Sequence, residues 1–298
     1  MKKLKILLTG AGGQLGQSLM HLPDFSDRVE WIPTDYTELD ITDRKAVGSF
    51  IFRTLPDFII NCAAFTDVDL AEKEFDRALM INSNGPENLA LAAKPAGIPL
   101  IHISTDYIFS GQGRKPYTET DEPDPQGAYG KTKLAGEQAL IKAGGKLIIV
   151  RTSWLYSGYG KNFFLTMLRL GKEKDSIGVV SDRTGSPTYA GDLATGLMKI
   201  VGYDNRHPGW INHPEIFHFC NGGTASWYDF SMAIMEISGL PCRVRAISTE
   251  QYPLPAPRPA YSVLDPEKFR KTFWPEIPFW RDSVRSCFEK YESIHKSI

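Results

Sequence analysis

The chain has 298 residues, of which 42% are hydrophobic and 23% are charged, and this composition is typical of a folded globular protein with room for a large core. Its 34 lysines and arginines nearly balance its 35 aspartates and glutamates, so its overall charge gives no general attraction to nucleic acid or to an anionic membrane. The sequence also lacks an apolar run long enough to span a bilayer.

The four cysteines are scattered and form no Cys-x-x-Cys pair, which predicts reduced thiols and no structural zinc. They are Cys62, Cys220, Cys242 and Cys287. The apolar run that follows the first lysines stops after Leu8, which is too short for the core of a signal peptide. The sequence therefore predicts a cytoplasmic protein without a metal centre.

Short apolar runs alternate with helical patterns over the first 155 residues. Strands are expected at 5–10, 29–35, 57–64, 99–104 and 146–153. Helices are expected at 14–22, at 42–55 with Thr42 or Asp43 as the N-cap, within 67–94, and from 128 onward. Strand and helix taking turns at this spacing predict an α/β fold, a Rossmann-type doubly wound parallel sheet.

Proline and glycine become frequent after residue 155, and the regular alternation stops. Helices are expected near 161–171, 190–201, 227–238 and 281–291. We therefore expect residues 1–155 to form the Rossmann domain and residues 156–298 to form mainly a smaller, less regular lobe. A segment at roughly 172–205 is a candidate for returning to the first domain.

A glycine-rich turn, "TGAGGQLG", joins the first expected strand to the first expected helix. Gly10, Gly13 and Gly16 allow a sharp turn and let a pyrophosphate approach the backbone at the helix amino end. Asp35 follows Gly16 by 19 residues and ends the second strand, where a carboxylate accepts hydrogen bonds from adenosine ribose hydroxyls. This context predicts a dinucleotide, NADH or NADPH. Asp35 favours NADH because it would repel a 2′-phosphate, although a loop arginine could still admit NADPH.

Tyr129 and Lys133 are four residues apart at the start of an expected helix, so they share one helix face. By itself the pair is more often a tyrosine packed on a lysine stem. Beside a nicotinamide, however, a tyrosine can protonate the alkoxide formed by hydride addition to a ketone, if an ammonium lowers its pKa. Ser104 and Thr105 end the fourth expected strand and offer hydroxyls to the carbonyl oxygen.

Four motifs stand in the order found in the extended short-chain dehydrogenase/reductases, and the chain resembles that family. They are Thr9-Gly10-x-x-Gly13-x-x-Gly16, Asn61-Cys62-Ala63-Ala64, Ser104-Thr105-Asp106 and Tyr129-x-x-x-Lys133. Within the family, blocks such as "NCAAFTDVDLAE", "RTSWLYSGYGKNF" and "GSPTYAGDLA" resemble the dTDP-4-dehydrorhamnose reductases over almost the whole chain. The resemblance implies NAD(P)H-dependent reduction of the 4-keto group of a dTDP-linked 6-deoxyhexose, giving dTDP-L-rhamnose, with the C-terminal lobe holding the substrate.

The resemblance assigns Tyr129 as the proton donor, Lys133 as its pKa-lowering and ribose-binding neighbour, and Thr105 as the residue that orients the keto oxygen. The implied cofactor contacts are Gly10, Gly13, Gln14, Leu15, Gly16, Asp35, Asp40, Ile41, Ala63, Ala64, Phe65, Thr66, Ile103, Tyr129 and Lys133. The implied substrate contacts are Thr105, Asp106, Tyr129, Trp154 and Arg258. Three of these positions keep an alternative: a capping carboxylate for Asp40, a core tryptophan for Trp154 and a solvated arginine for Arg258.

Other activities of the family compete with reduction. The 4,6-dehydratases carry a glutamate after the Thr-Asp pair, and Tyr107 stands there in this chain, which argues against elimination of water. An epimerase uses much the same Tyr and Lys and stays open, and so does a different nucleotide-sugar 4-ketoreductase. A non-catalytic, NADP-binding regulatory subunit is disfavoured because Thr105, Tyr129 and Lys133 are all present. His102 is expected to be a packed core residue rather than a base.

Some of these reductases form a dimer bridged by magnesium through glutamates. The matching positions are Ser18 and Gly191 here, and neither offers a carboxylate to a hard cation. We therefore expect a monomer or a homodimer without a bridging metal, and a dTDP-sugar as the main partner.

Overall fold

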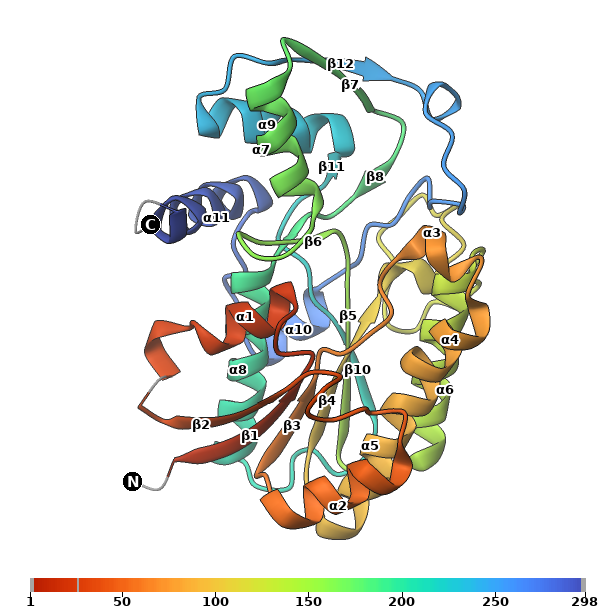
Figure 1. Ribbon diagram of the computed structural model, residues 1–298, viewed down its shortest axis with the longest axis vertical. Coiled ribbons are helices and arrows are strands. Elements are labelled where there is room, and N and C mark those ends of the chain that lie inside the picture. Colours follow the sequence, from red (N-terminus) through yellow and green to blue (C-terminus); the bar gives the residue numbers. More distant parts are fainter. Residues whose placement is uncertain (1–2, 26, 296–298) are drawn as a thin grey trace.

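The computed structural model describes residues 3–25 and 27–295. Figure 1 shows a large sheet with helices on both faces and, beyond the ends of its strands, a smaller lobe that contains α7, α9 and α11. Within the described residues no helix is both long enough and apolar enough to cross a membrane.

The large sheet has six parallel strands in the order β10-β5-β4-β3-β1-β2. They are β1 (Leu4–Thr9), β2 (Val29–Thr34), β3 (Phe58–Asn61), β4 (Leu100–Thr105), β5 (Leu147–Thr152) and β10 (Glu215–His218). The first five lie in the expected apolar runs, and the doubly wound α/β fold is confirmed. Strand β10 was not expected; it comes from the C-terminal half and pairs with β5 at the edge of the sheet.

Helices cover both faces of this sheet because its strands alternate their side chains between two apolar cores. Ile6 and Leu8 of β1 pack with α1 (Gln14–Met20), α8 (Ala190–Arg206) and α10 (Glu267–Thr272). Leu7, between them, packs with α2 (Arg44–Thr54), α5 (Gly85–Ala93) and α6 (Ala128–Ala143) on the opposite face (Figure 1). Asp43 caps α2 by accepting hydrogen bonds from two backbone N–H groups.

The segment expected to hold one helix within 67–94 is divided. It contains α3 (Val68–Ala71), α4 (Phe75–Leu79), a π-helical turn (Met80–Asn84) and then α5. Within the turn, the side chain of Asn82 binds the backbone N–H and C=O of Phe65. This pair of hydrogen bonds holds the chain that leaves β3 against the helices beside it.

The smaller lobe is built around aromatic side chains, among them Phe164, Phe230 and Trp280. Its helices are α7 (Phe163–Glu173), α9 (Trp227–Ser238) and α11 (Trp280–His295), close to three of the expected ranges. Its short strands are β6 (Leu155–Tyr156), β7 (Ser176–Val180), β8 (Thr184–Gly185), β9 (Thr188–Tyr189), β11 (Ala225–Ser226) and β12 (Arg243–Ile247). The fourth expected range, 190–201, is α8, which packs on α1 under the large sheet.

A buried ion pair fixes α6 to the sheet. Arg151 of β5 contacts Glu137 of α6 at 2.7 Å, and both side chains are at most 3% exposed. Glu137 also accepts a hydrogen bond from Ser104 of β4. Because α6 carries Tyr129 and Lys133, this network sets their height above the strand ends.

We predict that Arg151→Leu lowers the free energy of unfolding by about 3–5 kcal/mol, because it leaves the Glu137 carboxylate buried without its counter-charge. The exposed pair Arg169–Glu173, at 2.8 Å, provides the control. Arg169→Leu should cost no more than about 0.5 kcal/mol. Urea denaturation followed by circular dichroism measures both, and equal costs would show that the buried pair does not stabilise the fold.

Candidate active site

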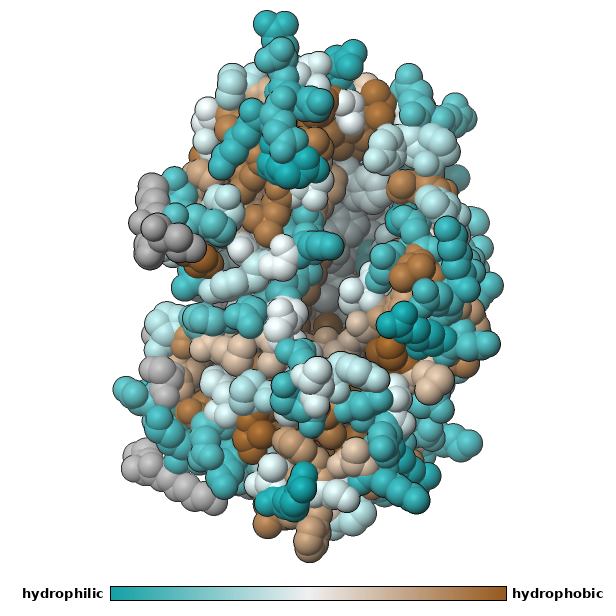
Figure 2. Space-filling model, in the orientation of Figure 1, coloured by the Kyte–Doolittle hydropathy of each residue, from teal (hydrophilic) through white to brown (hydrophobic). Residues whose placement is uncertain are grey.

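A cleft of about 1200 Å³ lies between the carboxyl ends of the large sheet's strands and the smaller lobe. Figure 2 shows it as a deep hollow that opens on this face of the molecule. It is lined by all of the expected site residues except Phe65. One cavity therefore brings together glycines near residue 10, a tyrosine at 129 and an arginine at 258.

The glycine loop forms one wall of the cleft, and two of its glycines are required by close backbone contacts. Gly10 has a φ of +69°, and a Cβ there would lie 2.6 Å from the backbone nitrogen of Ala63. A Cβ on Gly16 would lie 2.5 Å from the carbonyl oxygens of Gly10 and Ala11. Gly13 is the N-cap of α1 and has no side-chain capping partner, so free backbone N–H groups face the cleft.

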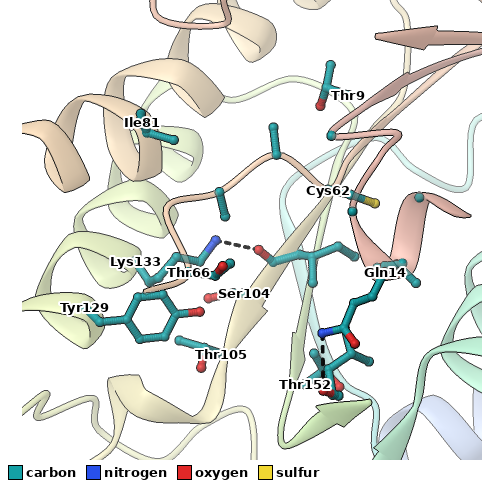
Figure 3. A pocket seen from close by; sticks show the side chains of 18 of the residues that line it. Thr9, Gln14, Cys62, Thr66, Ile81, Ser104, Thr105, Tyr129, Lys133 and Thr152 are labelled. Carbon is teal, nitrogen blue, oxygen red and sulfur yellow. Dashed lines mark hydrogen bonds between the residues drawn. The ribbon is translucent and has the colours of Figure 1, made fainter. Parts of the chain in front are cut away.

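Gln14 connects this loop to the smaller lobe. Its Nε2 donates to the carbonyl oxygen of Leu155 at 3.2 Å, and its Oε1 accepts from Ser157 at 3.4 Å. Figure 3 shows Gln14 extending along one side of the cleft toward Thr152 at the end of β5. The residue therefore lies beside the cleft and also joins the glycine loop to the smaller lobe.

The two acidic residues expected to contact adenosine are held differently. Asp35 Oδ2 accepts a hydrogen bond from the Gly12 backbone N–H at 2.8 Å, and no partner for its other oxygen is found in the part of the chain that the structure describes. Asp40 accepts hydrogen bonds from both the backbone N–H and the hydroxyl of Thr42, so its side chain acts as a local capping carboxylate, the alternative given for it in the sequence analysis. Asp40 also lines the cleft. Ile41 is buried and packs against Gly85.

Ala63, Ala64, Thr66 and Ile103 line the middle of the cleft. Phe65, expected among the cofactor contacts, does not line it. Its side chain is 8% exposed and packs away from the cleft against α3, α4 and the start of α6. The reason is the pair of hydrogen bonds from Asn82, which holds the Phe65 backbone so that the ring faces inward.

Tyr129, Lys133 and Thr105 meet on the wall opposite the glycine loop, as Figure 3 shows. Lys133 is 2% exposed and its Nζ donates to the carbonyl oxygen of Ile103 at 2.6 Å. Thr105 Oγ1 donates to Asp106 and accepts from the Tyr107 backbone N–H. A ketone placed here would lie within reach of a phenol, an ammonium and a hydroxyl.

The expected lowering of the Tyr129 pKa is absent from this structure. Burial raises the pKa of Tyr129 to about 12, and a hydrogen bond with Thr105 only partly offsets it. Burial also lowers the pKa of Lys133 to about 8. The lysine does not act on the phenol here because its Nζ is bound to the Ile103 carbonyl oxygen and lies 3.2 Å from His102.

Two buried polar atoms that line the cleft have no hydrogen-bond partner, and they are the only such side-chain atoms among the described residues. They are Asp106 Oδ2 and Thr152 Oγ1. Burial raises the pKa of Asp106 to about 6. Unpaired buried polar atoms are costly, so the Thr152 hydroxyl, and the Asp106 carboxyl beyond its hydrogen bonds with Thr105 and Ser262, have capacity left for a polar ligand.

Trp154 and Arg258, the two residues expected to contact substrate from beyond the first strands and helices, both line the cleft and are both anchored. Trp154 has a φ of +46°, donates from Nε1 to Ser262 at 3.2 Å and packs against Gly185. Arg258 binds Asp69 at 2.9 Å and is 13% exposed, so it is not simply solvated. Each therefore presents a fixed surface to the cleft.

Sequence reasoning missed several lining residues. Among them are Thr152, Ser153, Lys161, Arg77 and Ile81. Thr152 alone carried a usable signal, since it ends a strand beside Thr105. The others reach the cleft from turns and helices whose approach depends on tertiary packing.

We predict that Gly16→Ala weakens dinucleotide binding by about tenfold or more, equivalent to about 1.4 kcal/mol, because the new methyl displaces the loop backbone. Gly48→Ala is the control, since a Cβ there meets nothing within 4 Å. Titration calorimetry with NADH and NADPH measures both variants. Unchanged affinity in Gly16→Ala would show that this loop does not bind the phosphates.

Residues 4–293 match the family model described as "RmlD substrate binding domain". The chain is 42% identical to a dTDP-4-dehydrorhamnose reductase of Aggregatibacter actinomycetemcomitans, covering 95% of this chain and 97% of the relative. It is 41% identical to the spore coat polysaccharide biosynthesis protein SpsK of Bacillus subtilis, covering 97% and 98%. A crystal structure of dTDP-4-dehydrorhamnose reductase from Bacillus anthracis in complex with NADP is 38% identical and superposes with a TM-score of 0.90, covering 97% of this chain and 100% of that one.

These matches extend over nearly the whole length of the chain, and they agree with the parallel sheet, the glycine loop and the cleft between the two lobes. The chain therefore belongs to the family of the RmlD substrate binding domain, that of the dTDP-4-dehydrorhamnose reductases.

Proposed function

We propose that this protein is an oxidoreductase that uses NADH or NADPH to reduce the 4-keto group of dTDP-4-dehydrorhamnose, giving dTDP-L-rhamnose. The observation that carries the proposal is the convergence of Thr105, Tyr129 and Lys133 on the wall facing the glycine loop. Relatives with 42% and 41% identity are named for this reductase and for polysaccharide biosynthesis, which supports the same substrate and a role in making surface polysaccharide.

The bound nicotinamide would supply the hydride. Tyr129 Oη is a donor available to the keto oxygen, and the Thr105 hydroxyl becomes a second one when it turns away from Asp106, to which it donates here. Tyr129 delivers the proton as the alkoxide forms. A phenol whose pKa is raised to about 12 by burial keeps its proton until a stronger base appears beside it, which an alkoxide is. Lys133 then stabilises the phenolate with its charge once its Nζ turns toward the ribose and Tyr129.

The cleft surface beside Tyr129 argues against elimination of water. Tyr107, at the position where a dehydratase carries glutamate, packs edge-to-face on Tyr129 with ring centroids 5.5 Å apart. Burial raises the pKa of Tyr107 well above its ordinary value, so it stays a neutral phenol. The site thus lacks at this position the second carboxylate that elimination of water requires.

The cofactor-binding role of the glycine loop and Asp35 is part of this proposal, as are the substrate contacts from Asp106, Trp154 and Arg258. Asp35 favours NADH, whereas the Bacillus anthracis relative was crystallised with NADP. Both cofactors therefore belong in the assay. The smaller lobe beyond residue 155, which excludes α8, β10 and α10, is proposed to hold the dTDP-sugar.

We also propose a cytoplasmic monomer or homodimer without a bridging metal. Four free cysteines, three of them buried, suit a reducing compartment. Ser18, at one of the positions where some relatives carry a metal-binding glutamate, turns its hydroxyl onto the carbonyl oxygen of Gln14. A magnesium ion bound between two copies at Ser18 and Gly191 would contradict this part of the proposal.

The direct test supplies dTDP-4-dehydro-L-rhamnose with NADH or NADPH, follows the loss of cofactor absorbance and identifies the product by NMR. Stoichiometric oxidation of the cofactor with formation of dTDP-L-rhamnose is expected. An epimerase would convert the sugar without net consumption of cofactor. A folded protein that binds either cofactor but turns over neither would contradict the reductase.

Tyr129→Phe should lower kcat by about 10²- to 10⁴-fold, the usual contribution of a positioned acid, because phenylalanine has no hydroxyl to give the proton. Cofactor affinity should stay close to that of the unmodified protein. Tyr252→Phe is the control, since Tyr252 is 56% exposed and lies outside the cleft. If kcat survives the loss of the Tyr129 hydroxyl, the proton comes from elsewhere.

The pH dependence tests Asp106. Its carboxylate form, the hydrogen-bond acceptor for sugar hydroxyls, exists above a pKa of about 6. We expect kcat/KM to fall about tenfold per pH unit below pH 6, and Asp106→Asn to abolish this acidic limb. Glu119→Gln is the matched control, because burial also raises the pKa of Glu119 but that residue lies outside the cleft. A limb that persists in Asp106→Asn would assign it to another group.

A further inference from the structure

A row of hydrogen-bonded side chains runs beneath the cleft from the end of β1 to Lys133. Thr9 donates to Asn61 Oδ1 at 2.7 Å, Asn61 Nδ2 lies 2.9 Å from His102 Nδ1, and His102 Nε2 lies 3.2 Å from Lys133 Nζ. Asn61 and His102 are fully buried. His102 is therefore the packed residue that the sequence predicted, but its polar atoms lead directly to the lysine of the site.

The orientation of the Asn61 amide is fixed by the backbone. The N–H of Ala63 can only donate, and it points at Asn61 Oδ1 at 3.1 Å. The other end of the amide, the NH₂ group, must therefore face His102 Nδ1. Since an NH₂ group only donates, Nδ1 has to be the acceptor and carries no proton.

The proton of a neutral His102 then lies on Nε2, the nitrogen that faces Lys133. Burial and the nearby Lys133 charge hold the pKa of His102 well below its usual range, so the ring is neutral at physiological pH. An Nε2–H facing an ammonium places two donors against each other. The contact becomes a hydrogen bond only when Lys133 is an amine whose lone pair accepts from Nε2–H.

We propose that His102 is a positioning residue for Lys133: held in its Nε2–H tautomer by Asn61, it disfavours the ammonium in the cofactor-free protein, so that cofactor binding is accompanied by proton uptake at Lys133. The tautomer follows from the geometry alone, whereas the uptake rests on the proposed function. When ribose hydroxyls offer acceptors to Nζ, the lysine gains partners that the histidine does not provide, and its ammonium form is stabilised.

Among the other described groups around Lys133, none takes the place of His102 as the side-chain donor that disfavours its ammonium form. Glu137, one turn further along α6, favours the ammonium, but its oxygens are bound by Arg151 and Ser104. The Cys62 thiol, which follows β3, is neutral because burial raises its pKa to about 12, and its sulfur points away from Lys133 in Figure 3. The Ile103 carbonyl oxygen accepts one hydrogen bond from Lys133 Nζ.

The first test reads the tautomer directly. Long-range ¹H–¹⁵N correlation spectra of protein labelled in its six histidines, with His102 assigned through His102→Phe, should show a proton on Nε2 and no titration between pH 5 and 9. A proton on Nδ1, or titration of His102 near its usual pKa, would overturn the proposal whether or not the protein is a reductase.

The second test reverses the tautomer. Asn61→Asp places an acceptor opposite Nδ1, which moves the proton there and leaves Nε2 as an acceptor for the ammonium. The pKa of Lys133, followed through its ¹³Cε shift, should rise by about one unit or more. Because the new carboxylate also attracts the ammonium, Asn61→Asp with His102→Phe is the control. An equal rise in the double variant would attribute the effect to charge and contradict the role of His102.

The third test measures protons. Titration calorimetry with NADH or NADPH in buffers of different ionisation enthalpy, near pH 9, should show uptake of about half a proton to one proton per site, because this pH lies above the Lys133 pKa of about 8. The uptake should shrink in Asn61→Asp and persist in His218→Gln, which removes the other fully buried histidine. Cofactor binding without uptake contradicts the inference, whereas failure to bind either cofactor contradicts the proposed function instead.

Discussion

All six strands of the large sheet are parallel, so their carboxyl ends meet along one edge, and the chemistry of this protein depends on that constraint. Thr9 lies beside Asn61 in the strand register, and Thr105 lies beside Thr152. Side chains that are far apart in the chain thus become neighbours without any further device. The glycine loop and α6 then add the two walls that enclose this edge.

The helices do not rest on the sheet through apolar packing alone. The Glu137–Arg151 pair ties α6 to β5, and Ser104 adds a bond from β4. Fixed polar contacts of this kind define the height and rotation of a helix more sharply than apolar side chains, which can slide. Tyr129 and Lys133 of α6 therefore owe their position to charges that lie one to two turns beyond them on the helix.

Much of this arrangement can be predicted from sequence because it is local. Tyr129 and Lys133 share a face by helix geometry, and Gly10, Asp35 and Thr105 sit at strand ends that the apolar runs mark. Side-chain direction in irregular segments is not local, and for that reason Phe65 was assigned to the cleft although its ring packs behind it. The pKa of Tyr129 was also expected in the wrong direction, because the degree of burial of a phenol cannot be seen from spacing.

Strand β10 and the role of His102 show the same limit. Residues Glu215–His218 follow a stretch rich in proline and glycine where the regular alternation has stopped, and only pairing with β5 reveals a strand there. His102 reads as one more buried residue of a central strand until its two nitrogens are traced to Asn61 and Lys133.

Gln14 holds the glycine loop to the smaller lobe through Leu155 and Ser157. The loop that would receive the phosphates and the lobe that would receive the sugar are therefore linked to each other at this point. If the lobe moves away from the sheet on this side, it has to break both hydrogen bonds of the Gln14 side-chain amide. At the far side of the cleft, the Arg258 side chain and the Ala256 backbone N–H both bind Asp69 of α3, so that side is held by contacts that do not involve the glycine loop.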